Sequence, residues 1–595
     1  MPPMNPRRNS RVGPDSIQNN WQGYFESSEE VLHACIRDDN ITLLRQLVGS
    51  SSSTSPSPQI NYDIRGLGSP LHFAVICGRE DAVDLLLAAG ADPLMLGGNQ
   101  DDGFFTPAAR AASHGHRDIC RKIWLSAPPD QQVANAIGRN PLLAAAMHGH
   151  ASLVGDLLTL WDGWSMEVKV QAFLWSARRW HADVSLRLLE STTFETSTYQ
   201  EALHAAVPNK TLLGEERGIP RYDAIDFIQQ QSLIALLIEA GADPNSLSSD
   251  WPLIVVAAAN GNTTGALKTL LEQGADPNKT SAQGLSALHL LASPVPRQAL
   301  RSRPAAINDP AIRLLLKHHA SAAQPDEMGE CPLHWAAFGF DDLHYFHLYL
   351  SSSPDIETAL HLENHAGETL LHFASLGDRL ETIEFLISRG LNVNARNSNG
   401  WTPLMCALTP GNGYVLYRGG GHIKKLQHAL RTAKFLLSHG ADPLIVTDEG
   451  WTPLHALALN YDDEERSGDI AGFTRDLISR GVDPEARAPL LSSFERESYG
   501  ARSVPWGRRL PAAMQDPSAL RLMIKPNLAP LYWAAERGAV GVIRGLLSHG
   551  VSVSSADESE ITPTRLVAES SFLQQGRLKT ASVIMNLLLD AGAGF

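Results

Sequence analysis

Residues 69–93 read SPLHFAVICGREDAVDLLLAAGADP, and this stretch decides the fold. Ser69 suits the residue before a helix, and Pro70 suits the first helical position, where its missing N–H removes no hydrogen bond. A short apolar helix follows, then a turn that contains glycine, then a second helix with paired leucines. Gly90 ends the second helix in a left-handed conformation, and Pro93 blocks its continuation. We therefore predict a hairpin of two short helices.

Both halves of this stretch return along the chain. The first half recurs, with variation, as ECPLHWAA at Glu330, TLLHFAS at Thr369, WTPLMCA at Trp401, WTPLHALA at Trp451 and APLYWAA at Ala529. The second half recurs as LLIEAGADP at Leu236, LLEQGADP at Leu270, FLLSHGADP at Phe435 and LISRGVDP at Leu477. Leu71 to Gly90 and Leu371 to Gly390 are both 19 residues. One helix pair cannot bury its own apolar face, so the units must stack.

These linked phrases resemble those of the ankyrin-repeat family, whose period is about 33 residues. The resemblance covers nearly the whole chain and implies an all-α solenoid of about 13 helix-turn-helix units, which binds partners through its concave face. The units near residues 171–199 and 561–595 are degenerate. We expect a disordered segment at 1–28, a repeat array at 29–490, a basic insertion in a hairpin loop at 491–528, and C-terminal repeats at 529–595.

Four units are longer than the plain repeat. They are Leu203–Gly241, Leu288–His319, Leu404–Gly440 and Leu454–Gly481. In each of them the extra residues fall between the two helices, so the sequence predicts inter-helix insertions along one rim. They are either tolerated surface loops, since long loops cost little extra entropy, or functional elements.

The segment 491–528 lies between two repeats and is basic. It holds six arginines and lysines and three acidic residues, a net charge of +3 in a chain whose net charge is −15. It either folds back onto the acidic array or docks an acidic partner.

Composition excludes several classes of protein. An apolar fraction of 43% is ordinary for a folded chain and rules out wholesale disorder. The net charge of −15 argues against nucleic-acid binding by the whole surface, which needs lysine and arginine to displace counterions. The five cysteines form no CxxC pair, and their odd, sparse count suits a reducing compartment. No apolar run indicates a secretory signal or a membrane span, so we expect a cytoplasmic or nuclear protein.

Catalytic motifs are missing from the sequence, which has no GxSxG, HExxH or GxxxxGK[ST]. We expect no enzyme activity and no cofactor. His344 and His347 stand three apart with Asp341 and Asp342 nearby, a spacing that also fits metal ligands. The resemblance gives His334 and His372 structural hydrogen bonds instead. We interpret these histidines as structural or solvated and expect no metal site.

The register of the repeat places candidate partner-binding residues. In the family, the two residues after the alanine pair of each first helix point into the concave groove. This register gives Ser113, His114, Met147, His148, Arg178, Arg179, Ala259, Asn260, Phe338, Leu376, Glu536 and Arg537. The early groove is rich in histidine and arginine and the middle is apolar. We therefore predict a partner segment with an acidic half and an apolar half. Nearby Trp175 is either a core residue or part of an aromatic binding patch.

The leading hypothesis is a non-catalytic scaffold or adaptor that acts as a monomer on protein partners and contacts neither nucleic acid nor membrane directly. One alternative is a nuclear transcriptional co-regulator that uses its repeats. Another is an enzyme or pathway accessory with a site built from degenerate repeats and insertions.

Overall fold

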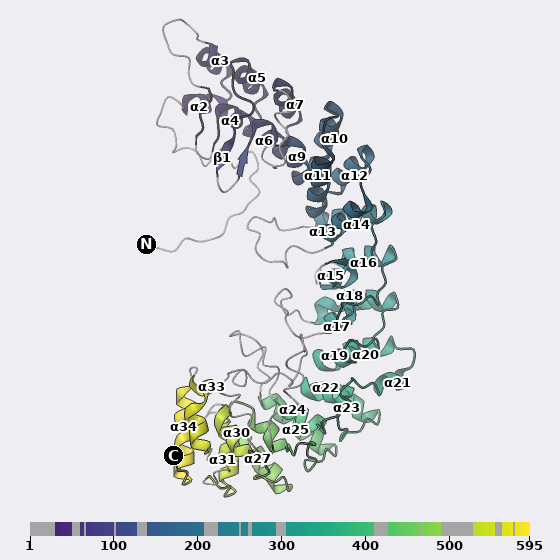
Figure 1. The fold of residues 1–595 in the computed structure, drawn as a ribbon, viewed down its shortest axis with the longest axis vertical. Helices are drawn as coiled ribbons and strands as arrows, with labels where there is room; N and C mark the ends of the chain where they lie inside the picture. Colours follow the sequence, from purple (N-terminus) through teal and green to yellow (C-terminus); the bar gives the residue numbers. More distant parts are fainter. Residues whose placement is uncertain are drawn as a thin grey trace. The chain divides into compact units, whose positions relative to one another are not determined.

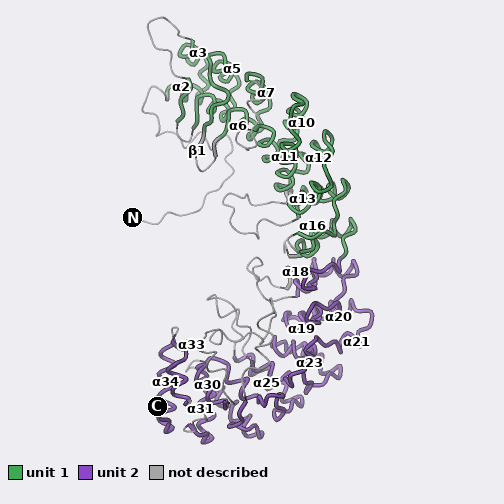
Figure 2. Tube along the Cα trace, in the orientation of Figure 1, with its two compact units in different colours: residues 1–276 green, residues 277–595 purple. Residues whose placement is uncertain are grey.

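The computed structural model of the chain describes residues 30–49, 60–64, 67–99, 103–127, 140–207, 224–248, 251–259, 264–292, 305–409, 426–462, 467–488, 528–553, 562–574 and 577–594. The chain forms two compact units, residues 1–276 and residues 277–595 (Figure 2). Their boundary falls inside the predicted array 29–490. Residues 1–28, residues 491–527 of the predicted insertion 491–528, and Asn260 lie outside the described residues, and the bounds of the four predicted domains stay predictions.

Helices alternate through unit 1 as the first and second members of hairpins (Figure 1). The first helices are α2 (Glu30–Arg37), α4 (Pro70–Ile76), α6 (Pro107–His114), α9 (Pro141–His148), α11 (Met166–Arg178), α13 (Thr196–Ala206) and α15 (Leu253–Ala259). The second helices are α3 (Ile41–Gly49), α5 (Glu80–Ala88), α7 (Arg117–Ser126), α10 (Ala151–Leu160), α12 (Ala182–Ser191), α14 (Ala224–Glu239) and α16 (Thr264–Glu272). Two antiparallel strand pairs complete the unit, β1 (Gly97–Asn99) with β2 (Gly103–Phe105) and β3 (Leu247–Ser248) with β4 (Trp251–Pro252). Gly97 pairs with Phe105, and Leu247 pairs with Pro252.

Unit 2 repeats the same hairpin. Its first helices are α17 (Ala287–Ala292), α19 (Pro332–Gly339), α22 (Leu370–Leu376), α24 (Pro403–Leu408), α26 (Pro453–Ala458), α30 (Pro530–Arg537) and α32 (Pro563–Glu569). Its second helices are α18 (Ala305–Lys317), α20 (Leu343–Ser351), α23 (Leu380–Ser388), α25 (Leu426–Ser438), α27 (Ser467–Ser479), α31 (Val540–Leu547) and α34 (Leu578–Asp590). Two short extra helices, α21 (Ile356–Leu360) and α33 (Ser571–Gln574), lie between them in the chain. The prediction of an all-α repeat fold is confirmed.

The first helices begin where the sequence predicts. The side chain of Ser69 accepts a hydrogen bond from the backbone N–H of His72, and Thr106 accepts one from Ala109. Proline follows both caps at the first helical position, where its missing N–H costs nothing. The alanines that come next, such as Ala74 and Ala108, are buried, so neighbouring first helices pack closely.

The four long units carry their extra residues between the two helices, as the spacing predicts. These stretches join α13 to α14, α17 to α18, α24 to α25 and α26 to α27. Most of their residues lie outside the described part of the chain, so whether they are plain loops or functional elements stays open.

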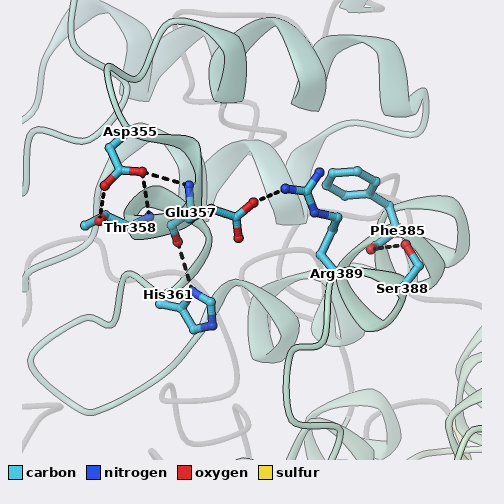
Figure 3. A network of polar contacts seen from close by, with 7 residues as sticks. All are labelled: Asp355, Glu357, Thr358, His361, Phe385, Ser388 and Arg389. Carbon is cyan, nitrogen blue, oxygen red and sulfur yellow. Dashed lines mark hydrogen bonds and ion pairs between the residues drawn. The ribbon is translucent and has the colours of Figure 1, made fainter.

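Helix α21 lies in the chain between α20 and α22, and Figure 3 shows the polar contacts of its residues. The side chain of Asp355 caps it, accepting from the backbone N–H groups of Glu357 at 3.1 Å and Thr358 at 3.3 Å. Arg389, at the end of α23, forms an ion pair with Glu357 and so ties α21 to the next repeat. His361 donates from Nδ1 to the Glu357 carbonyl at 2.9 Å. These contacts account for a helix where the plain repeat has only a loop.

Glycine in the left-handed region ends most of the second helices described in unit 2 and three of those described in unit 1, and His319 stands at the equivalent position after α18. Its φ is +64°, close to the +87° of Gly274 and the +85° of Gly390. A side chain in this conformation contacts the following carbonyl oxygen, which costs about 1 kcal/mol.

We expect His319→Gly to raise the free energy of unfolding by about 0.5 kcal/mol, since the relieved strain exceeds the extra entropy that glycine has in the unfolded chain. Urea denaturation followed by circular dichroism measures the change. His318→Gly is the matched control, because His318 has no positive φ, and it should lower stability. A loss of stability in the His319 variant would contradict the prediction.

Candidate protein-binding surface

The histidine- and arginine-rich candidates lie together at the C-terminal ends of three successive first helices of unit 1. We call this surface the His/Arg strip, and it comprises Ser113 and His114 of α6, Met147 and His148 of α9, and Arg178 and Arg179 at the end of α11. The side chains of His114, His148 and Arg178 are exposed, and the other three are half-buried. The spacing of the repeat stacks these positions one above another.

The inter-helix turns hold the strip in place through a second set of histidines. His150 donates from Nε2 to the carbonyl of Ser113 at 3.1 Å, and His181 donates from Nε2 to the carbonyl of Met147 at 3.1 Å. Each bond joins a turn to the first helix of the preceding repeat and satisfies a helix-end carbonyl. These histidines position the strip.

Two glycines make room for these rings. A side chain at Gly115 would meet the ring of His150 at 2.7 Å, and one at Gly149 would meet the ring of His181 at 2.8 Å. Both glycines have positive φ, which glycine adopts without strain. The sequence-based prediction did not include His150 and His181, although histidine recurs at this turn position as His116, His150 and His181.

Positive charge accumulates around His148. Partial desolvation lowers the pKa of His148, and the nearby charges of His150, Arg179 and Arg110 lower that pKa further, against the raising effect of its bond to the Ala144 carbonyl. Desolvation also lowers the pKa of His114, with Arg110, His116 and His148 among the charges that add to the effect. The side chains of adjacent repeats therefore share one electrostatic environment.

The arginines of the strip have no carboxylate partner among the described residues, whereas other surface arginines do. Arg117 pairs with Asp156, and Arg396 pairs with Asp448 at 2.7 Å. The guanidinium of Arg178 instead lies 5.0 Å from the centre of the Trp175 ring, which is half-buried. Trp175 thus contributes to the strip through the packing of its ring against the guanidinium of Arg178. These uncompensated charges stand in a chain of net charge −15.

The remaining candidates lie elsewhere. Phe338 and Leu376 are half-buried at equivalent positions of adjacent repeats in unit 2, and Arg379 donates from Nε to the carbonyl of Phe338 at 2.7 Å. Ala259 is the last residue of α15, and nothing of its side chain is described.

Glu536 and Arg537 are buried, with 6% and 2% of their surface exposed, and they pair with each other at 3.1 Å. A surface for partners cannot use side chains buried in this way.

The histidines of α19, α20 and α22 have structural contacts. His334 and His372 are buried, and His372 donates from Nε2 to the carbonyl of Trp401 at 3.0 Å. His344 accepts from Arg313 at 2.9 Å, and the ring of His347 lies 4.5 Å from that of Phe385. Across the described residues, no three His, Cys, Asp or Glu side chains gather closely enough to hold a metal ion. No helix in the described ranges has the length and apolar character needed to cross a bilayer.

Comparison with known proteins supports the repeat assignment. A model of three ankyrin repeats matches residues 340–417, and a single-repeat model matches residues 68–97 and 399–448. Human inversin is 27% identical over 177 residues, which are 26% of this chain and 16% of inversin. Mouse RelA-associated inhibitor is 50% identical over 44 residues, 7% of this chain and 5% of that protein. The chain thus matches only a small part of each relative, and the matches support a protein-interaction role in general terms.

Proposed function

Because this chain is an ankyrin-repeat protein, we propose that it is a non-catalytic scaffold or adaptor that binds protein partners on its first-helix surface. The observation that carries the proposal is the His/Arg strip, where Arg178 and Arg179 have no carboxylate partner among the described residues and lie beside the exposed histidines of the two preceding repeats. An acidic segment of a partner supplies the missing charge. Phe338 and Leu376 offer a second, apolar contact for a partner.

Stacked repeats suit such a role. A surface held by helix packing loses little conformational entropy when a partner binds, so more of the contact energy appears as affinity. Complementary charge adds specificity and speeds association. We also propose that the chain is a monomer and that it is located in the cytoplasm or the nucleus.

Charge reversal in the strip tests the proposal. We expect Arg178→Glu combined with Arg179→Glu to reduce recovery of bound partners about tenfold or more, because two attractive contacts become repulsive. The measurement is quantitative mass spectrometry of partners that co-purify with the tagged full chain from cells.

The matched control reverses two exposed arginines of second helices, Arg121→Glu with Arg187→Glu. It changes the net charge equally and should leave the partner set intact. Equal partner sets for the wild-type chain and the strip variant would refute the His/Arg strip as the binding surface.

A further inference from the structure

The exposed histidines of the His/Arg strip are each held in one tautomer. His114 donates from Nδ1 to the carbonyl of Arg110 at 2.9 Å, and His148 donates from Nδ1 to the carbonyl of Ala144 at 2.9 Å. A carbonyl oxygen only accepts, so Nδ1 carries the proton and Nε2 is left with a lone pair. Each ring thus keeps one nitrogen that gains an N–H only on protonation.

Protonation of these rings is opposed first by their partial desolvation and then by the charges around them. His148 is faced by Arg110 and His114 from α6, by His150 from the turn before α10, and by Arg179 and His181 from the end of α11 and the turn before α12. His114 is faced by Arg110, by His148, and by His116, whose ring stacks on it at 5.9 Å. The carboxylates nearest to these rings in sequence are Asp118, in the first turn of α7, and Asp156 of α10, which pairs with Arg117.

A bound anion favours the protonated form of these histidines. A carboxylate next to His114 or His148 favours the protonated ring, and one placed against Arg179 also offsets a charge that lowers the pKa of His148. Each ring then takes up a proton at Nε2 and offers that new N–H to the anion as a charge-assisted hydrogen bond. Binding of the anion and binding of the protons therefore favour each other.

We propose that the His/Arg strip binds a carboxylate-rich segment of a partner protein together with protons, so that acidification strengthens the complex. The inference rests on the proposed function and names the chemistry and the regulation of that surface. A protein segment fits better than a nucleic acid, because the strip spans only three repeats and the net charge of −15 repels a long polyanion.

The sign of the effect follows from linkage. Binding raises the pKa of both histidines, so the extra affinity appears as the pH falls through the raised value. The gain is complete once the pH is below the lower pKa that each ring has in the free protein. Above that range, Arg178 and Arg179 hold the segment alone, and affinity no longer depends on pH.

The test uses the full chain and a fluorescent peptide of about ten aspartates, whose own titration lies near pH 4. Anisotropy at constant ionic strength gives the dissociation constant, which we expect to fall about fivefold between pH 7.5 and pH 6.0. Circular dichroism at each pH confirms that the chain stays folded. Calorimetry in MES and in cacodylate, two buffers of different ionisation enthalpy, counts the protons taken up.

Two double variants and a control double variant separate the parts of the inference. We expect His114→Gln with His148→Gln to lose the pH response and the proton uptake, because glutamine does not titrate. Arg178→Glu with Arg179→Glu should abolish binding throughout the range, and Arg121→Glu with Arg187→Glu should bind as the wild-type chain does.

Other results overturn the inference in distinct ways. If peptide binding depends on Arg178 and Arg179 but not on pH, the proposed coupling to protons is wrong. The proposed scaffold function is not affected by that result. The peptide could fail to bind although charge reversal still reduces the recovery of partners from cells. That result would contradict the proposal that the partner segment is rich in carboxylates. Tighter binding of an oligonucleotide with the same number of charges would replace the protein segment by a nucleic acid.

Discussion

Lowering the pH from about 7 to about 5 is expected to cost the folded chain several kcal/mol of stability, because buried histidines must stay neutral in it. Five of them occupy equivalent positions of five first helices and are almost fully buried, and the four with the largest shifts are His72, His289, His334 and His455. Burial lowers the pKa of each to about 4, well below the ordinary value of 6.5. The unfolded chain therefore binds more protons than the folded chain between these two values.

The hydrogen bonds explain why these rings cannot take a second proton in place. His289 accepts the backbone N–H of Ser286 at Nδ1, at 3.0 Å, and donates from Nε2 to the carbonyl of Glu330, at 2.9 Å. His455 repeats the arrangement with the N–H of Thr452 at 3.1 Å and the carbonyl of Leu528 at 3.2 Å. A proton on Nδ1 would face another N–H, so protonation breaks the cap of the helix.

The sign and size of the effect follow from linkage. The stability that the neutral rings provide is complete above pH 6.5 and is lost as the pH falls toward about 4. Within that window each ring costs about 1 kcal/mol per pH unit. Urea denaturation at a series of pH values, followed by circular dichroism, measures the loss.

Another first helix of the chain shows which apolar residue can replace His455. Met405 occupies the equivalent position of α24 and is buried. His455→Met should lower stability at pH 7.5, since the two hydrogen bonds are lost, and should also make stability less dependent on pH by about 1 kcal/mol per unit. The same pH dependence in variant and wild type would show that His455 is not among the titrating groups.

Replacing Trp180 by glycine should destabilise unit 1 by about 2–4 kcal/mol, although glycine suits the backbone there better. Trp180 lies in the turn between α11 and α12 with a φ of +62°, where the two preceding repeats have Gly115 and Gly149. The relief of strain favours glycine by about 1 kcal/mol. The loss of a fully buried indole costs about 3–5 kcal/mol, so the cavity decides the outcome.

The indole joins three helices. Its Nε1–H donates to the carbonyl of Ala206 at 2.8 Å, at the end of α13, and its ring lies 5.8 Å from the ring of Phe227 on α14. Gln230 of α14 donates to the same carbonyl at 2.8 Å. Trp180 therefore fixes the end of α13, where the long segment before α14 begins.

A matched variant separates the backbone effect from the cavity. Asp378 lies at the equivalent turn position in unit 2 and has a φ of +60° but a much smaller side chain. Asp378→Gly should change the free energy of unfolding by about 1 kcal/mol or less. Urea denaturation of both variants gives the comparison, and a Trp180→Gly chain as stable as the wild type would contradict the packing argument.

Local sequence decided which residues begin and end each helix. Ser69 and Pro70, or Gly90 before Ala91-Asp92-Pro93, act on their own turn through capping and backbone conformation, so they are readable without a structure. The lengthened units were predictable for the same reason, because a fixed helix spacing exposes any insertion. The candidate residues Ser113, His114, Met147 and His148 followed from this register.

Contacts between repeats could not be predicted from the local sequence. The sequence gives Glu536 and Arg537 the same register as Arg178 and Arg179, yet the first pair is buried and the second is not. Burial depends on which chain segments pack over a position, and repeat register contains no such information. The role of Trp180 was hidden for the same reason, since its partners Ala206 and Phe227 come from later helices.

Sequence alone determined that the chain consists of stacked helix pairs, because the caps, glycines and apolar positions that define each pair act within about 33 residues. Only the tertiary structure decided which polar side chains of that stack are exposed without a partner among the described residues, and the proposed binding surface rests on that observation. Charge compensation and burial arise between residues far apart in the sequence, as Arg117 with Asp156 shows, and they exist only once the repeats have packed.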